Sequence, residues 1–260
     1  MTTVKPGRGR RWAGPTTERR SKHGLSKKKR QSSRTNLVQK RSSNHTGIGN
    51  QNSSTSHRTS VFVGENFTVS YSQWFIFNKL VKDTCACGVI CTTLQTLREA
   101  KHMRLSMDAV RLLSVPNAGG SSVISEVLSY ELLHTCFGAT LLKTEMEVSY
   151  FPRGGSITDY VCGLAGVKIG VSVTRAMKYQ GNYTQNDACY LLKKKLSGIV
   201  QSSRNTLEKW NKQILHVWTR SREDADHVKQ AFDTMDSATR SNTLVLVTIA
   251  TDCDAIFANK

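Results

Sequence analysis

Hydrophobic and polar positions follow regular patterns from residue 114 to the end of the chain. Apolar residues three and four positions apart indicate helices, whereas alternation or a short continuous apolar run indicates a strand. The pattern predicts one helix, a run of three strands and then two helix–strand pairs. We expect the helices to begin at Ser121 or Ser122, at Thr184 and at Ser221. The strands are expected over residues 141–151, 157–164, 167–175, 214–218 and 243–250.

This order of elements predicts an α/β fold with a mixed central sheet flanked by helices. Only short turns separate the first three strands, so we expect them to form a meander. The last two strands are continuous apolar runs reached through helices, which is typical of strands inside a sheet that is covered on both faces. We therefore predict an α-β-β-β-α-β core with an added α-β over residues 114–260.

Residues 61–113 fit this pattern poorly, and we treat them as a poorly defined N-terminal extension. Apolar spacing across residues 94–113 predicts a helix. Cys85, Cys87 and Cys91 lack the paired spacing that is usual for zinc ligands, so reduced thiols are favoured over a zinc site. The sequence leaves open whether this extension folds.

The first 60 residues differ from the rest in composition. Up to Arg58 there are 15 basic residues and one acidic residue, which together account for +14 of the formal net charge of +18. The segment has too few apolar residues to offset the entropy of ordering it, so we predict a disordered basic tail over residues 1–60. Such a tail binds nucleic acid without sequence preference, and added salt weakens that binding.

Two basic clusters in this tail are candidate nucleic-acid contacts or a nuclear localisation signal. The alternative is a solvated basic segment without a dedicated receptor. We expect a nuclear protein, with a mitochondrial or cytoplasmic location as alternatives, and we expect no membrane partner because the apolar runs are too short to span a bilayer. The clusters consist of Arg19, Arg20, Lys27, Lys28, Lys29 and Arg30.

Asp159 is the only carboxylate in residues 154–178, the predicted hairpin of the sheet. Side chains on a strand point alternately to its two faces. In residues 167–175 one face is aliphatic and the other carries small polar residues, so we expect a cleft on the polar side. That side holds Lys168, Gly170, Ser172 and Thr174.

The order of elements over residues 121–218 resembles that of the PD-(D/E)XK nuclease superfamily. This resemblance implies a restriction-endonuclease-like fold and Mg²⁺-dependent phosphodiester hydrolysis, in which acids hold the cation and a lysine positions or activates water. Glu126 resembles the acid of the first helix, and Asp159 resembles the aspartate of the second strand. Glu126 and Asp159 would therefore be the metal ligands.

The third strand departs from the superfamily pattern. Ser172 and Thr174 occupy the positions of its acid and lysine, and neither residue supplies the required charge. Lys168 lies on the same face but earlier in the strand, so we name it as the candidate catalytic lysine. Other candidate replacements are Lys178, Lys193 or Lys194 for the lysine and Glu145 or Glu147 for the carboxylate.

These observations lead to three hypotheses about function. The first is a nucleic-acid-associated protein whose nuclease-like domain is catalytically degenerate, which implies no cofactor. The second is an active Mg²⁺-dependent nuclease with a relocated lysine, and the third is a scaffold that binds only protein. Lys193, Lys194 and Lys195 are candidate phosphate contacts, with a solvated helix face as the alternative.

Overall fold

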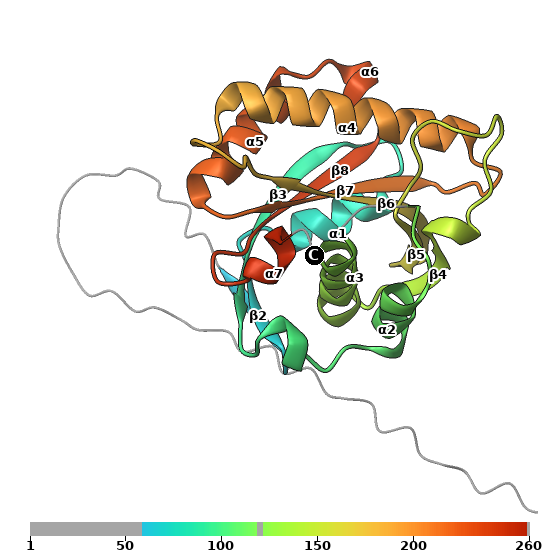
Figure 1. The fold of residues 1–260 in the computed structure, drawn as a ribbon. Helices are drawn as coiled ribbons and strands as arrows, with labels where there is room; N and C mark the ends of the chain where they lie inside the picture. Colours follow the sequence, from blue (N-terminus) through green and yellow to red (C-terminus); the bar gives the residue numbers. More distant parts are fainter. Residues whose placement is uncertain (1–58, 119–121, 259–260) are drawn as a thin grey trace, which may run out of the picture. The chain divides into compact units, whose positions relative to one another are not determined.

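A computed structural model describes residues 59–118 and 122–258, and the predicted basic tail with its two clusters lies almost wholly outside these residues. The described part contains an eight-stranded sheet with helices on both faces (Figure 1). This arrangement confirms the predicted α/β class with a mixed sheet. The strands are β1 (Ser60–Val63), β2 (Phe67–Tyr71), β3 (Gly88–Thr96), β4 (Thr140–Thr144), β5 (Tyr160–Leu164), β6 (Val167–Ala176), β7 (Lys212–Thr219) and β8 (Thr243–Ile249).

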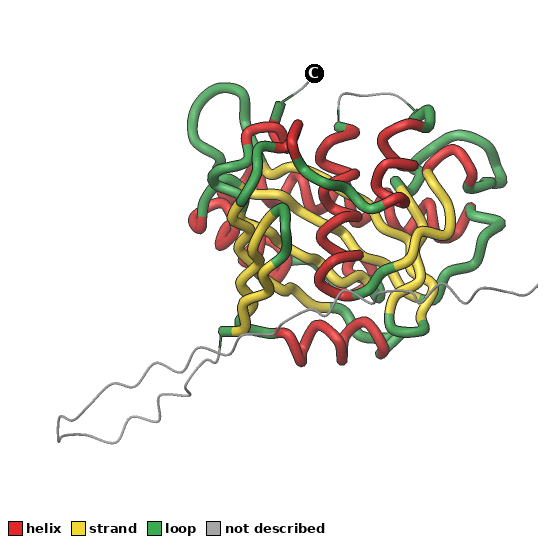
Figure 2. Tube along the Cα trace, turned by 90° about the horizontal axis from the view of Figure 1, so that it is seen from below, coloured by secondary structure: helices red, strands yellow, loops and turns green. Residues whose placement is uncertain are grey.

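The strand order across the sheet is β1-β2-β3-β8-β7-β6-β5-β4. Four central strands, β3, β8, β7 and β6, run parallel to one another, and antiparallel strands extend the sheet at both ends. Every residue of β7 and β8 is buried, as expected for continuous apolar strands covered on both faces. The tube view from below shows the strands crossing the middle of the molecule between helices (Figure 2).

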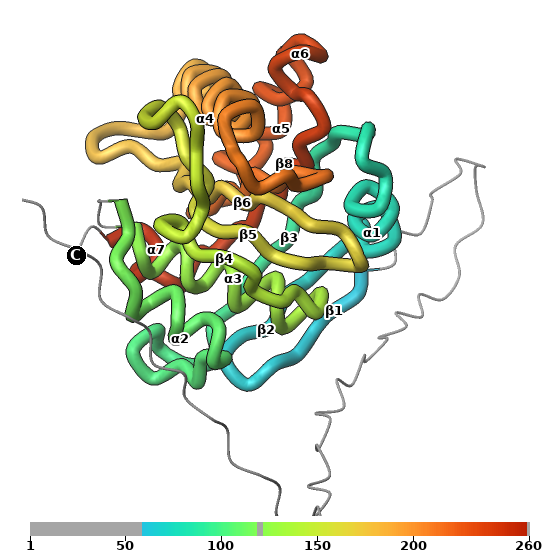
Figure 3. The backbone as a smooth tube through the Cα atoms, turned by 90° about the vertical axis from the view of Figure 1, so that its right-hand side faces the viewer, coloured from blue at the N-terminus to red at the C-terminus, as the bar shows by residue number. Residues whose placement is uncertain are grey.

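Helices form two layers, one on each face of the sheet (Figures 1 and 3). On one face α4 and α5 pack against β7 and β8 through an aliphatic cluster that includes Leu192, Leu196 and Val228. On the other face α3 packs against the sheet, with α1, α2 and α7 contributing to the same core. The helices are α1 (Trp74–Lys82), α2 (Met107–Ser114), α3 (Val123–Phe137), α4 (Gln185–Asn205), α5 (Arg222–Thr234), α6 (Ser237–Arg240) and α7 (Asp254–Phe257).

Two of the predicted helix starts have the expected side-chain caps. Thr184 accepts a hydrogen bond from the Asp187 N–H while the Asp187 carboxylate accepts one from the Thr184 N–H, which forms a capping box. The Ser221 hydroxyl caps α5 by accepting a hydrogen bond from the Asp224 N–H, without the reciprocal bond of a capping box. Ser122 precedes α3 but does not cap it with its hydroxyl, which donates instead to the Glu126 carboxylate.

Residues 61–113, interpreted from the sequence as a poorly defined N-terminal extension, belong to the same sheet as the later strands. This segment supplies β1, β2 and β3, and β3 lies in the middle of the sheet with β8 as its parallel neighbour. The predicted helix over residues 94–113 is wrong in its first part, because β3 continues to Thr96 and α2 begins only at Met107, and it is confirmed from Met107 onward. Leu94 pairs with Val69 across the sheet, so tertiary pairing decides its conformation.

Two strand boundaries near the expected site also differ from the prediction. The strand expected over residues 141–151 ends at Thr144 and is followed by a short 3₁₀ turn over Glu145–Glu147. The strand expected from residue 157 begins at Tyr160. Glu145 and Asp159 therefore lie at the ends of strands, where a side chain is freer to leave the pleat than inside a ladder.

In the described part of the chain, no helix combines the length and the apolar composition that crossing a membrane requires.

Candidate functional site

Asp159 lies directly before β5, at the point where β5 begins to pair with β6. Its N–H donates to the Val171 carbonyl oxygen at 3.0 Å, and its Oδ2 accepts from the Val173 N–H at 2.5 Å. The carboxylate is thus fixed against the backbone of the neighbouring strand. The side chain is only partly exposed, so water stabilises its charge less than it would at the surface.

Glu126 and Glu145 bring two more carboxylates into this region. Glu126 lies in the first turn of α3, and its Oε1 accepts from the Ser122 hydroxyl at 2.6 Å. Glu145 follows β4, and its Oε2 accepts from the Ala118 N–H at 2.6 Å. Three segments that are distant in sequence therefore place one carboxylate each near the start of β5.

The three carboxylates interact electrostatically. Burial and the negative charges of Glu126 and Glu145 together raise the pKa of Asp159 to about 8, although the hydrogen bond from the Val173 N–H acts in the opposite direction. Burial also raises the pKa of Glu145, with Glu126 adding to that effect. Asp159 is consequently protonated for the most part at neutral pH, a state typical of buried like-charged carboxyl groups.

Lys195 on α4 supplies the positive charge that acts on Asp159. Its ammonium lowers the pKa of Asp159 and so partly offsets burial and the two glutamates. The sequence placed Lys195 among possible phosphate contacts but did not connect it with Asp159. A lysine on the helix after β6 therefore acts electrostatically on the carboxyl group that precedes β5.

Ser172 and Thr174 share the α4-facing side of β6. Val171 and Val173 belong to the apolar core on the opposite face, so the residues that alternate with them face α4. Both Ser172 and Thr174 are buried, and they add hydroxyl groups but no charge to the region next to Asp159.

The structure places Lys168, the candidate catalytic lysine, in an ion pair elsewhere. Its ammonium donates to Glu208 at 3.3 Å, and Lys143 binds the same carboxylate. The charge of Lys168 is therefore already neutralised by a carboxylate outside the Asp159 region. Lys178 likewise binds Asp187, and Lys193 and Lys194 are exposed on the outer side of α4.

Glu147 does not join the three carboxylates. It binds the Arg111 guanidinium through both oxygens, at 2.5 and 2.7 Å, and accepts a hydrogen bond from the Thr144 N–H at 2.8 Å. These partners hold its pKa below the usual range. Of the two replacement carboxylates considered from the sequence, only Glu145 lies near Asp159.

Carboxylate oxygens are suitable ligands for Mg²⁺, but the arrangement here does not fit a bound ion. Within residues 59–118 and 122–258, no group of three or more Asp, Glu, His or Cys side chains is placed to hold a metal ion. Glu126, Glu145 and Asp159 each accept a hydrogen bond from a protein donor instead. The three carboxylates therefore interact electrostatically but do not form a preformed metal site in the part of the chain that the structure describes.

His216 forms part of a buried polar chain that the sequence did not reveal. Its Nδ1 lies 2.7 Å from the Ser129 hydroxyl and its Nε2 lies 2.8 Å from the Thr248 hydroxyl. Ser129 also bonds to the Tyr160 hydroxyl, and Thr248 bonds to Thr92. Burial lowers the pKa of His216 to about 3, so the ring is neutral and serves as a structural link between α3, β7 and β8.

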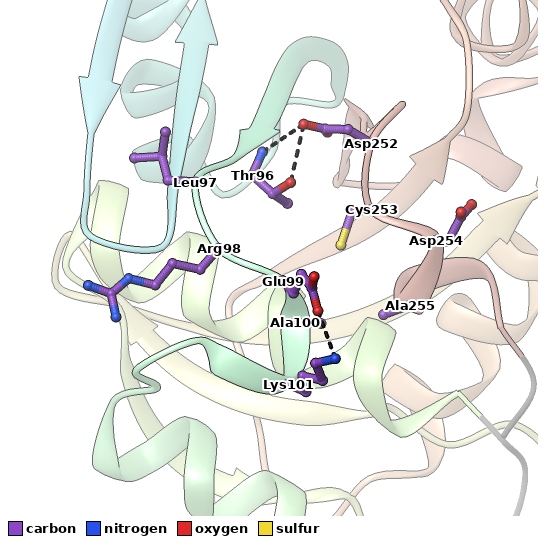
Figure 4. A pocket seen from close by; sticks show the side chains of 10 residues that line it. All are labelled: Thr96, Leu97, Arg98, Glu99, Ala100, Lys101, Asp252, Cys253, Asp254 and Ala255. Carbon is purple, nitrogen blue, oxygen red and sulfur yellow. Dashed lines mark hydrogen bonds and ion pairs between the residues drawn. The ribbon is translucent and has the colours of Figure 1, made fainter.

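A separate cleft of about 530 Å³ lies at the carboxyl ends of β3 and β8 (Figure 4). Such crevices often bind ligands in α/β sheets. Here, however, Asp252 accepts hydrogen bonds from the N–H and hydroxyl of Thr96, and Lys101 pairs with Glu99. Because these polar groups satisfy one another, we assign no ligand to this cleft.

Comparisons with known proteins place few limits on function. No protein-family model matches the sequence, and no solved structure matches it. The chain is 40% identical over 190 residues to a Dictyostelium discoideum protein named "AAC-rich mRNA clone AAC4 protein". The match covers 70% of this chain but 28% of that protein, so the chain spans less than a third of the length of its relative. The relative's name states no activity.

Proposed function

We propose that this protein associates with nucleic acid and carries a nuclease-like domain whose catalytic set is incomplete. The observation that supports incompleteness is the pair Ser172 and Thr174, which lies beside Asp159 where the PD-(D/E)XK pattern requires an acid and a lysine. Phosphodiester hydrolysis requires charge neutralisation at the phosphate and an activated water. Two hydroxyl groups provide neither.

Nucleic-acid association is supported by the distribution of charge along the chain. The first 58 residues carry a net charge of +14, whereas the remaining 202 residues carry +4. A positive segment of this kind neutralises phosphates and releases bound counterions, which gives affinity that depends steeply on salt. The tail would supply non-specific affinity, and the folded domain would supply shape or a further contact surface.

Binding measurements on the full chain and on a chain that lacks residues 1–58 test this proposal. Fluorescence anisotropy with labelled DNA and RNA should give a lower affinity for the shortened chain, by at least about tenfold at low salt, and a shallower dependence of log Kd on log salt. Equal affinity and equal salt dependence in both chains would show that the tail is not the source of binding.

An active metal-dependent nuclease is the second candidate, and one observation favours it. Glu126, Glu145 and Asp159 interact with one another, and Lys195 lies close enough to affect Asp159. If these carboxylates rearrange to bind Mn²⁺ or Mg²⁺, the cation should raise the melting temperature of the native protein but not of Asp159→Asn. The leading proposal predicts the same small response to the cation in both proteins.

A further inference from the structure

We infer that the solvent-exposed side of α4 binds single-stranded nucleic acid, an inference that rests on the proposed association with nucleic acid. This surface, called the α4 face below, consists of residues at successive helical spacings of three or four, which places them in one stripe. Its members are Tyr190, Lys193, Lys194, Ser197, Gln201 and Arg204, all of them exposed.

Charge is the first property that fits a phosphate backbone. α4 contains three lysines and an arginine, and its single acidic residue is Asp187. The Asp187 carboxylate already accepts hydrogen bonds from the Thr184 hydroxyl and N–H, and it forms an ion pair with the Lys178 ammonium. The exposed positions of α4 therefore carry positive charge and no carboxylate, which is the electrostatic pattern that attracts polyanions.

Exposed aromatic rings are the second property. Tyr190 is 72% exposed in the middle of the first half of α4, one turn before Lys193 and Lys194. Phe151 is 74% exposed, and its N–H donates to the Asn205 carbonyl oxygen at 2.8 Å, which fixes Phe151 beside the last turn of α4. Aromatic rings beside cations are the usual platform on which unpaired bases stack.

The segment between the end of the 3₁₀ turn and β5 runs alongside α4 (Figures 1 and 3). Ser156 contacts Gly198, and its N–H donates to the Gln201 side chain at 3.1 Å. The exposed Arg153 lies in this segment, between Phe151 and Ser156. Phe151 continues the α4 face beyond Arg204, so aromatic rings lie near both ends of this surface.

A cleft of about 560 Å³ lies at the C-terminal half of this surface. Pro152, Val200 and Ala238 provide apolar walls, and Gln201, Arg204 and Thr239 provide polar groups. A nucleobase has the same mixture of an apolar face and polar edges. The cleft can therefore accept one base of a strand whose phosphates follow the lysines.

The dimensions agree with a short stretch of a single strand. Fourteen residues separate Tyr190 from Arg204, which corresponds to about 21 Å along the helix axis. A stacked strand has about 3.4 Å per nucleotide, so the α4 face can contact on the order of six nucleotides. In a duplex the faces of the bases stack on neighbouring base pairs, so they cannot stack on Tyr190 or Phe151. For this reason we assign a single strand.

Charge reversal on α4 tests the inference in the full-length protein. Lys193→Glu/Lys194→Glu should weaken binding of a labelled single-stranded oligouridylate by at least about tenfold and reduce the slope of log Kd against log salt by about 1.4. The matched control is Lys79→Glu/Lys82→Glu, which makes the same charge change at two exposed positions of α1 on the opposite face of the sheet. The control should change Kd by less than about threefold.

Substitution of Tyr190 tests the stacking contribution. Tyr190→Ala should weaken single-strand binding by roughly 5- to 100-fold without changing the salt slope, and Tyr190→Phe should retain the affinity because the ring is kept. Binding of a duplex of the same length should not respond to either substitution.

The outcomes separate this inference from the proposed function. If the native chain binds neither DNA nor RNA, both fail. If it binds and the α4 charge reversal behaves like the α1 control, the α4 face is excluded while nucleic-acid association through another segment stands. If Tyr190→Ala binds as tightly as the native chain, single-strand recognition by this surface is overturned.

Discussion

Asp159 and His216 show how burial acts in opposite directions on an acid and a base. Burial raises the pKa of Asp159, which reaches about 8 with the effect of two nearby glutamates, and burial lowers the pKa of His216 to about 3, because in both cases burial favours the neutral form. The negative charges of two glutamates also act on Asp159, whereas each ring nitrogen of His216 forms a hydrogen bond with a neutral hydroxyl group. Asp159 therefore changes its protonation state near neutral pH, whereas His216 stays neutral and serves as a structural element of the core.

Asp159→Asn should make the protein more stable at alkaline pH. The native carboxyl keeps its proton up to about pH 8, whereas the unfolded carboxyl loses it near its ordinary value of 3.8, so the native protein loses stability as pH rises between these values. Urea denaturation should show Asp159→Asn to be more stable than the native protein by about 1 kcal/mol or more at pH 8, with a smaller difference at pH 5. The control is Asp226→Asn, an exposed acid on α5. A difference that does not vary with pH would contradict the raised pKa.

His216→Ala should destabilise the protein by roughly 3 kcal/mol, because it leaves a cavity and removes a partner from both Ser129 and Thr248. The native ring stays neutral to about pH 3, whereas the unfolded ring takes up a proton below about 6.5, so stability is lost as pH falls through this range. Urea denaturation should therefore show a smaller loss on acidification for His216→Ala than for the native protein. His102→Ala, at an exposed position, should change stability by less than about 0.5 kcal/mol.

At the scale of elements, Lys212 connects the two halves of the sheet. It is the first residue of β7 and is fully buried, and its ammonium donates to the carbonyl oxygens of Asp83 at 2.8 Å and of Ala86. These carbonyls belong to the connection between α1 and β3. A buried cation thus closes the end of α1 and fixes this connection against β7, which is favourable near a helix C-terminus.

Lys212→Met tests this connection. The substitution keeps a long apolar stem but leaves two carbonyl oxygens without their donor, at a cost of about 1–3 kcal/mol. Hydrogen exchange of the amides in residues 83–88 should become faster, together with a lower free energy of unfolding. Lys229→Met, at an exposed position of α5, should change neither quantity. Unchanged exchange in Lys212→Met would show that the ammonium does not hold the connection.

Much of the fold could be predicted from the sequence. The strands β6, β7 and β8 have strong local apolar patterns, and α4 has an apolar stripe and a clear N-terminal cap. β3 could not be predicted, because its place in the sheet depends on pairing with β8, a strand more than 150 residues later. For the candidate site, the resemblance to the nuclease superfamily points to Glu126 and Asp159, which the structure shows to interact electrostatically. Lys195 was not connected with them, because whether a helix lysine turns toward a strand depends on how the helix packs.

At the scale of the whole molecule, the strands of residues 59–118 and 122–258 form one sheet rather than an extension and a separate domain. A chain that begins at residue 59 should therefore unfold in one cooperative transition. A chain that begins at residue 114 should not, because β8 loses its parallel neighbour and the core loses Phe77, Ile90 and Leu94. Thermal unfolding followed by circular dichroism distinguishes the two. Cooperative unfolding of the shorter chain would support a domain boundary at residue 114.

In the function proposed above, one molecule combines affinity for nucleic acid with an incomplete catalytic set. The most direct test incubates the full-length protein with labelled single- and double-stranded DNA and RNA in Mg²⁺ or Mn²⁺, and measures bound and cleaved product in the same samples. We predict binding without cleavage, and the same absence of cleavage for Asp159→Ala. Cleavage by the native protein that Asp159→Ala abolishes would contradict this account and establish the carboxylates around Asp159 as a working nuclease site.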